Sequence, residues 1–156
     1  MTLRTTGIRP RLVLTLCVLL ALSACGGAPE SQEAELRAWV ETGHRLVEEK
    51  DRGELLDMIS PDYHDARGNE RADIENMLRL YFFRQHRIEL LTRINAIRII
   101  GDSAAELDLS VGMAGTNDGV LGVSADDYNF EMELIREDGD WLLIAGRWGE
   151  VGDDVR

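Results

Sequence analysis

The stretch AELDLSVGM, residues 105–113, alternates apolar and polar side chains without a break. A period of two predicts a β-strand with one buried and one exposed face. Residues 128–134 (YNFEMEL) repeat this pattern, and Asp138-Gly139 is typical of a hairpin turn into a last strand at residues 141–148. The C-terminal half is therefore predicted to form an antiparallel sheet, and this sheet decides the fold.

Two features adjoin these strands. Residues 87–100 are rich in Ile and Leu and predict one long strand, with a β-bulge where the apolar phase shifts between Leu90 and Leu91. Gly101-Asp102 then turns the chain toward the second strand. Residues 114–127 show little periodicity and contain three glycines, so we expect a loop there.

Before residue 87 the apolar period is that of a helix. Residues 31–50 predict an amphipathic helix, and residues 53–60 predict a short helix that ends before Pro61. A brief extended piece at residues 62–66 leads to a third helix at residues 70–85, for which Asn69 is the natural N-cap. Helices followed by strands predict an α+β domain, with the helices packed on one face of the sheet.

The third helix has more apolar residues than one face can hold. Its predicted core positions are Ile74, Met77, Leu78, Tyr81 and Phe82. Leu80 and Phe83 fall outside this stripe, which indicates a second contact, either with a sheet that wraps around the helix or with a partner subunit.

The N-terminal segment has the parts of an export signal. Three arginines precede the apolar run of residues 12–25, which is shorter than the roughly 20 residues that span a bilayer. Its end, LSAC at residues 22–25, resembles the lipobox of bacterial lipoproteins, which implies that Cys25 is lipidated and becomes the first residue of the mature chain. An ordinary secretory signal cut near Ala24 is the alternative. By the same resemblance, Gly26 implies an outer-membrane lipoprotein that faces the periplasm.

These features divide the chain into four parts. We expect a signal peptide at residues 1–24, a short tether at residues 25–30, one domain at residues 31–150 and a frayed tail at residues 151–156. The mature chain would attach to the membrane through Cys25. Because Cys17 would leave with the signal, the domain would hold no thiol, and therefore no disulfide and no thiolate metal site.

The charge balance restricts the partners. The chain has 17 Lys and Arg against 29 Asp and Glu, a net charge of −12. Loss of the signal arginines makes the mature chain more acidic still, so we expect no nucleic-acid partner and regard anionic lipid headgroups as poor partners. We expect no cofactor, because the sequence has no Gly-rich phosphate loop. We also expect no metal, because alternation along residues 62–65 places Asp62 and His64 on one side and Asp65 on the other.

The element order resembles the nuclear transport factor 2-like superfamily, in which a curved sheet wraps helices into a cone. The residues that carry the match are EEKDRGELLDMISPDYHDARG (48–68), the helix from Glu70, and the closing REDGDWLLIAGRW (136–148). The resemblance covers nearly the whole mature chain. It implies a fold more directly than an activity, because the superfamily includes isomerases, dehydratases, polyketide cyclases and transport adaptors.

Two functions follow from this resemblance. In the first, a binding or accessory module, Tyr63, Tyr81, Tyr128 and Trp148 would line a pocket for a small apolar ligand. Leu80 and Phe83 would form an interface with a protein partner or a second copy of the chain. In the alternative, a small lyase or isomerase of the ketosteroid isomerase or polyketide cyclase type, Asp65 would be the general base and His44 a hydrogen-bond donor. We expect the binding module.

Overall fold

The computed structural model describes residues 31–116 and 123–152. The predictions for the signal peptide, Cys25, the tether and residues 153–156 lie outside these ranges. No helix in the described part of the chain is long and apolar enough to cross a membrane.

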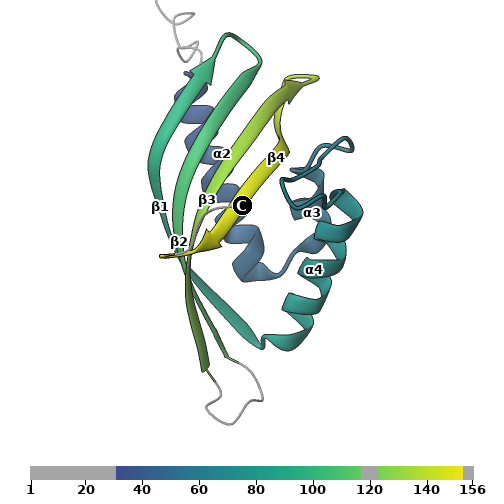
Figure 1. Cartoon of the computed structure of the whole chain (residues 1–156), viewed down its shortest axis with the longest axis vertical. Coiled ribbons are helices and arrows are strands. Elements are labelled where there is room, and N and C mark those ends of the chain that lie inside the picture. Colours follow the sequence, from purple (N-terminus) through teal and green to yellow (C-terminus); the bar gives the residue numbers. More distant parts are fainter. Residues whose placement is uncertain (1–30, 117–122, 153–156) are drawn as a thin grey trace, which may run out of the picture. The chain divides into compact units, whose positions relative to one another are not determined.

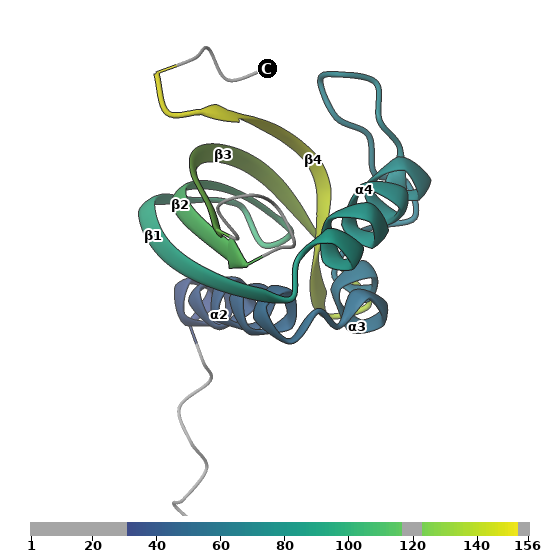
Figure 2. The ribbon, with the colours of Figure 1, turned by 90° about the horizontal axis from the view of Figure 1, so that it is seen from below.

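Three helices precede a four-stranded antiparallel sheet (Figure 1). The helices are α2 (Gln32–Glu49), α3 (Arg52–Asp57) and α4 (Arg71–Arg84). The strands are β1 (Arg87–Ile100), β2 (Ala104–Thr116), β3 (Val123–Glu137) and β4 (Asp140–Glu150), which pair in sequence order. The predicted α+β class is therefore confirmed. Figure 2 shows that the sheet is strongly curved and that the helices lie along one side of it.

Polar side chains begin the helices. The Ser31 hydroxyl accepts a hydrogen bond from the Ala34 amide at 3.2 Å, which satisfies an N-terminal N–H group of α2. The predicted cap of α4 is wrong by one residue. Glu70 precedes the helix, and its own amide donates to the Asp73 carboxylate at 3.0 Å. Asn69 does not cap the helix because its side-chain amide donates to Asp65 instead.

The strands are longer than predicted at the end of the molecule where β2 meets β3. β1 has the predicted bounds, but its bulge lies between Ile94 and Ala96 rather than at Leu90 and Leu91. The expected loop at residues 114–127 is partly wrong, because residues 114–116 pair with residues 123–125. Backbone pairing persists there without an apolar pattern. The predicted extended piece at residues 62–66 forms only an isolated bridge, between His64 and Glu70.

The core has two parts. The larger joins Leu36 and Val40 of α2 to buried residues of the strands, namely Ala105, Leu107, Leu109, Leu134 and Trp141. A smaller cluster of Leu56, Ile59 and Tyr63 packs against Ile74, Leu78 and Leu143. Full burial of Met77 is wrong, because 41% of this residue is exposed. Met77 borders an open space, whereas Ile74 and Leu78 of the same helix pack against the smaller cluster.

Candidate functional site

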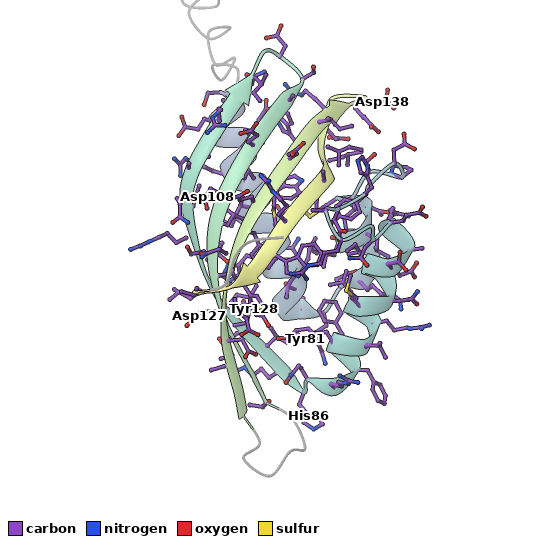
Figure 3. The ribbon with its side chains drawn as sticks, in the orientation of Figure 1. Tyr81, His86, Asp108, Asp127, Tyr128 and Asp138 are labelled. Carbon is purple, nitrogen blue, oxygen red and sulfur yellow. The ribbon has the colours of Figure 1, made fainter. Side chains whose placement is uncertain are left out.

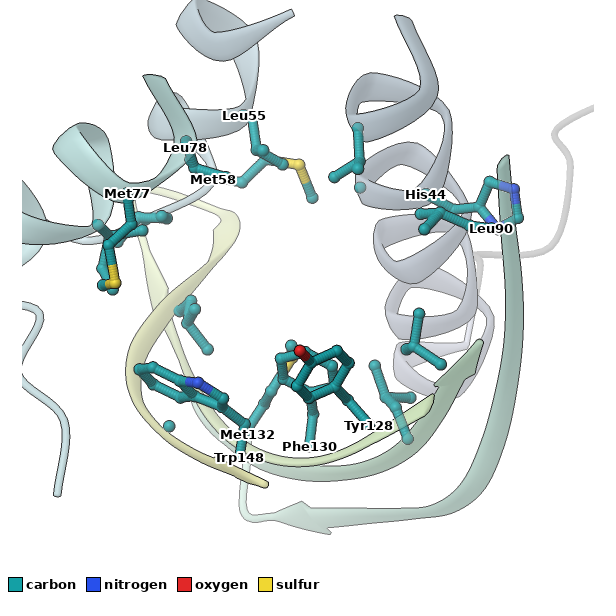
Figure 4. Close-up of a pocket in the computed structure, with 18 of the residues that line it drawn as sticks. His44, Leu55, Met58, Met77, Leu78, Leu90, Tyr128, Phe130, Met132 and Trp148 are labelled. Atoms are coloured by element: carbon teal, nitrogen blue, oxygen red, sulfur yellow. The ribbon is translucent and has the colours of Figure 1, made fainter. Parts of the chain in front are cut away.

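A cavity of about 640 Å³ lies between the helices and the concave side of the sheet. Figure 4 shows side chains from both layers pointing into it. Its wall is mainly apolar and aromatic, and includes Trp39, Val47, Leu55, Met58, Met77, Leu78, Tyr81, Leu109, Val111, Met113, Tyr128, Phe130, Met132 and Trp148. None of its described lining residues is an aspartate or a glutamate. Two arginines, Arg84 and Arg147, also line the cavity, and Arg147 pairs with Glu131 at 2.6 Å.

Alternation along β2 and β3 builds the part of the cavity wall that the sheet contributes. Leu109, Val111 and Met113 are every second residue of β2, and the same spacing on β3 places Tyr128, Phe130 and Met132 in the wall. Apart from Met1, every methionine in the chain lines the cavity. Methionine side chains are flexible and polarisable, so they adapt to ligands of different shape.

The tyrosines supply neutral hydrogen-bond donors. The structure places Tyr63, Tyr81, Tyr128 and Trp148 in the cavity wall, and Figure 3 shows Tyr81 and Tyr128 between α4 and the sheet. Burial, and then the charge of Asp65, raise the pKa of Tyr63 to about 12. Burial, followed by the Asp126 carboxylate, also raises the pKa of Tyr81 and of Tyr128. All three phenols therefore stay protonated at neutral pH.

His44 connects α2 to β1 at one side of the cavity. Its Nδ1 lies 3.1 Å from the Thr92 hydroxyl, and its Nε2 lies 3.2 Å from the Glu48 carboxylate. That carboxylate also accepts the Leu90 amide at 2.8 Å, so Glu48 holds the imidazole against the edge strand. The spacing of His44 and Glu48, four residues apart on one helix, is visible in the sequence. The contact with Thr92 is not, because 48 residues separate the two positions.

Asp65 lies in the loop between α3 and α4 and is not among the described lining residues. It is 6% exposed and accepts three hydrogen bonds: from the Arg67 amide at 2.8 Å, the Asn69 amide at 2.8 Å and the Asn69 side chain at 2.7 Å. Burial by itself would raise the pKa of Asp65, but these hydrogen bonds and the Arg67 charge together lower it. A base whose oxygens already accept these bonds is poorly placed to take a substrate proton. The structure does not bring Asp65 and His44 together across the cavity.

The same loop holds Trp148 in the wall. The Arg67 guanidinium lies 4.5 Å from the centre of the Trp148 ring and donates a 2.7 Å hydrogen bond to the Trp148 carbonyl. This cation–π contact orients a large aromatic side chain at the rim of the cavity.

Leu80 and Phe83, the predicted interface residues, are 52% and 88% exposed on α4. Within residues 31–116 and 123–152, no three His, Cys, Asp or Glu side chains lie close enough to hold a metal ion.

Comparison with solved structures shows which fold this is. A ketosteroid isomerase-like protein from Erwinia carotovora atroseptica superposes with a TM-score of 0.63 at 11% identity, over 77% of this chain and 96% of that chain. A candidate scytalone dehydratase from Novosphingobium aromaticivorans gives a TM-score of 0.68 at 10% identity, over 87% of each chain. A candidate calcium/calmodulin-dependent protein kinase II association domain from Xanthomonas campestris gives 0.65 at 18% identity, over 83% of this chain and 95% of that chain.

These similarities define the class of domain. The chain has the nuclear transport factor 2-like fold, with helices packed against a curved four-stranded antiparallel sheet. No protein-family profile and no curated protein sequence matches the chain. At these low identities the likeness concerns the fold alone, so the activities of the three proteins are not carried over.

Proposed function

We propose that this chain is a binding module for a small apolar molecule. The cavity of about 640 Å³ carries the proposal, because its size falls within the range of about 300–1,000 Å³ that is usual for ligand pockets. An apolar wall with a few polar groups is also typical of such pockets. Besides His44, the charged residues of its described wall are Arg84 and Arg147; Arg147 pairs with Glu131 at 2.6 Å, and Arg84 forms no ion pair with a described residue. This wall fits a neutral or weakly anionic ligand better than a cationic one.

The polar groups limit the ligand further. Protonated Tyr63, Tyr81 and Tyr128 offer hydroxyl groups to a ligand oxygen, and His44 with Thr92 offers a second polar point at the side of the cavity. We therefore infer a mainly hydrocarbon or aromatic molecule that carries one or two oxygen atoms. The methionines would adapt to its shape.

A titration with a fluorescent probe tests this proposal. The full chain is titrated with N-phenyl-1-naphthylamine, an uncharged fluorescent probe of apolar pockets. Val111→Trp fills the cavity wall, whereas Leu91→Trp adds the same group on an outer strand position that is 79% exposed. Probe that binds to residues 1–30 contributes equally to the signals of the parent protein and of both variants. We expect Val111→Trp to weaken probe binding at least about tenfold, or about 1.4 kcal/mol, and Leu91→Trp to leave it unchanged.

Two results would contradict the binding proposal. One is equal probe affinity in the two variants. The other is native mass spectrometry of the protein, purified from its own host, that shows no retained small molecule while the probe also fails to bind. Circular dichroism spectra that match the parent protein verify that Val111→Trp is folded.

We also propose that the module is lipid-anchored. The basic, apolar and LSAC segments at residues 4–25 support attachment through Cys25 to the bacterial outer membrane, on the periplasmic side. Several acyl chains at one cysteine would give the stable attachment that a single chain does not provide. In this setting the domain would bind its ligand close to a lipid surface.

The alternative function is a small lyase or isomerase. The similarity in fold to a ketosteroid isomerase-like protein from Erwinia and to a candidate scytalone dehydratase from Novosphingobium favours it. The position of Asp65 does not, since its oxygens are engaged within a loop. His44 lines the cavity, with Thr92 at its Nδ1 and the Glu48 carboxylate at its Nε2. A catalytic version of this site would therefore depend on His44 rather than on Asp65.

A further inference from the structure

The exposed side of α4 continues the apolar wall of the cavity onto the surface. Met77 and Leu80 both line the cavity, yet they are 41% and 52% exposed. Phe83, three residues after Leu80, is 88% exposed. Residues three apart are neighbours on a helix surface, so Met77, Leu80 and Phe83 form one stripe that runs from the rim of the cavity outward. We call these three residues the rim stripe.

The segment that follows Asp73 and Glu75 on α4 has a charge opposite to that of the chain. Residues 76–88 (NMLRLYFFRQHRI) contain three arginines and no acidic residue, whereas the whole chain has a net charge of −12. Arg79 and Arg84 form no ion pair with any residue of the described ranges, and Arg87 pairs with Glu89 at 2.6 Å. Asp126 lies near Tyr81, on the cavity side of the helix. Because Arg84 itself lines the cavity, the rim and the outer surface of α4 near its C-terminal end are both apolar and basic.

We propose that the rim stripe, with Arg79 and Arg84, docks on a membrane surface that carries anionic lipid headgroups. Exposed Leu and Phe side chains suit a membrane interface because they can enter its apolar part, while neighbouring arginines contact anionic headgroups. Docking here would bring the rim of the cavity to the lipid surface, so that an apolar molecule passes between membrane and cavity without crossing water.

The rest of the charge distribution does not prevent this docking. The acidic total repels an anionic surface only over distances comparable with the screening length, which is about 8 Å at physiological salt. The carboxylates nearest to the stripe on α4 already have partners, since Asp73 accepts the Glu70 amide at 3.0 Å and Glu75 lies 3.9 Å from Arg52. Arg79 and Arg84 have no carboxylate partner in the described ranges. A second copy of the chain is a poorer occupant, because a two-fold contact through this stripe would place Arg79 and Arg84 against their own copies.

Fluorescence quenching by spin-labelled lipids tests the docking. Phe83→Trp places a reporter on the rim stripe, and Leu91→Trp places the same reporter on the outer face of β1 as a matched control. Both full-chain variants are mixed with vesicles of phosphatidylcholine alone or of phosphatidylcholine with phosphatidylglycerol, and the parent signal is subtracted. Any attraction of residues 1–30 to the vesicles is common to both variants.

We expect the tryptophan at position 83 to be quenched at least about twofold more than the one at position 91, and only on the anionic vesicles. Replacing both Arg79 and Arg84 with Gln should abolish this difference. Equal quenching at the two positions would overturn the proposal, and so would quenching at position 83 that is the same on both vesicle types. A dimer or a protein complex that Phe83→Ser dissolves would assign the stripe to a protein partner instead.

This test is independent of ligand binding. The quenching experiment is made without N-phenyl-1-naphthylamine, and the probe titration above is made without vesicles. If the parent protein does not bind the probe, the binding module is refuted and the membrane contact is unaffected. Equal quenching at positions 83 and 91 would refute only the membrane contact.

Discussion

Replacement of Asp65 separates a structural role from a catalytic one. Its Oδ1 accepts the amides of Arg67 and Asn69, and its Oδ2 accepts the Asn69 side chain, at distances of 2.7–2.8 Å. Asp65→Ala removes every one of these acceptors from a site that is 6% exposed. Hydrogen bonds to a charged group contribute about 1.5–3 kcal/mol each, but water can enter this surface loop and recover part of the loss. We expect Asp65→Ala to lower the free energy of unfolding by about 2–4 kcal/mol.

Asp65→Asn should have a smaller effect. The amide keeps an oxygen for the two backbone donors, and rotation of the Asn69 amide restores the remaining hydrogen bond. Only the charge is lost, so we expect about 1–2 kcal/mol. Because the folded state lowers the pKa of Asp65 below its ordinary value of 3.8, the carboxylate stabilises the fold fully above that pH. The difference between the parent and Asp65→Asn should shrink as the pH falls through the lowered pKa.

Urea denaturation, followed by tryptophan fluorescence, measures these differences. Asp62→Asn is the matched control, because Asp62 is exposed in the same loop and its carboxylate makes no hydrogen bond to a described residue. The structural argument is refuted if Asp65→Ala is as stable as Asp62→Asn. It is also refuted if Asp65→Asn abolishes an isomerase or lyase reaction of the parent protein without changing its stability.

Three further predictions concern other parts of the chain. Gly43→Ala should stabilise the protein by about 0.5–1 kcal/mol, because the added Cβ meets only Met58 Cε, at 3.6 Å. Gly115→Ala should destabilise the protein by about 1–3 kcal/mol, because the added Cβ overlaps with the buried Gln85 side chain. Thermal unfolding of the two variants measures both changes. Since the pKa of Tyr63 is raised to about 12 in the fold, stability should fall as the pH rises from 10 to 12, and urea denaturation of Tyr63→Phe should show no such contribution. Cys25→Ser should abolish incorporation of labelled palmitate and shift the protein from the membrane to the soluble fraction; unchanged fractionation would contradict lipidation.

The sequence determined those features that depend on neighbours along the chain. Alternation in residues 105–113 and 128–134 predicted the strands, and the helical period of residues 31–50 predicted α2. These predictions succeed because side-chain direction follows directly from backbone geometry. The same pattern identified Leu80 and Phe83 as residues outside the predicted core stripe of α4. It failed where pairing continues without apolar alternation, as at residues 114–116 and 123–127.

Only the tertiary structure decided what the space between the layers is. Periodicity shows which face of α4 is apolar but not how far that face stands from the sheet, so Met77 was predicted to be buried although it borders an open cavity. Whether Asp65 faces a ligand or a loop depends on donors that folding brings to it, and the meeting of His44 with Thr92 depends on how α2 packs against β1. These contacts join positions whose separation is set by the packing of the whole domain, which no local pattern records.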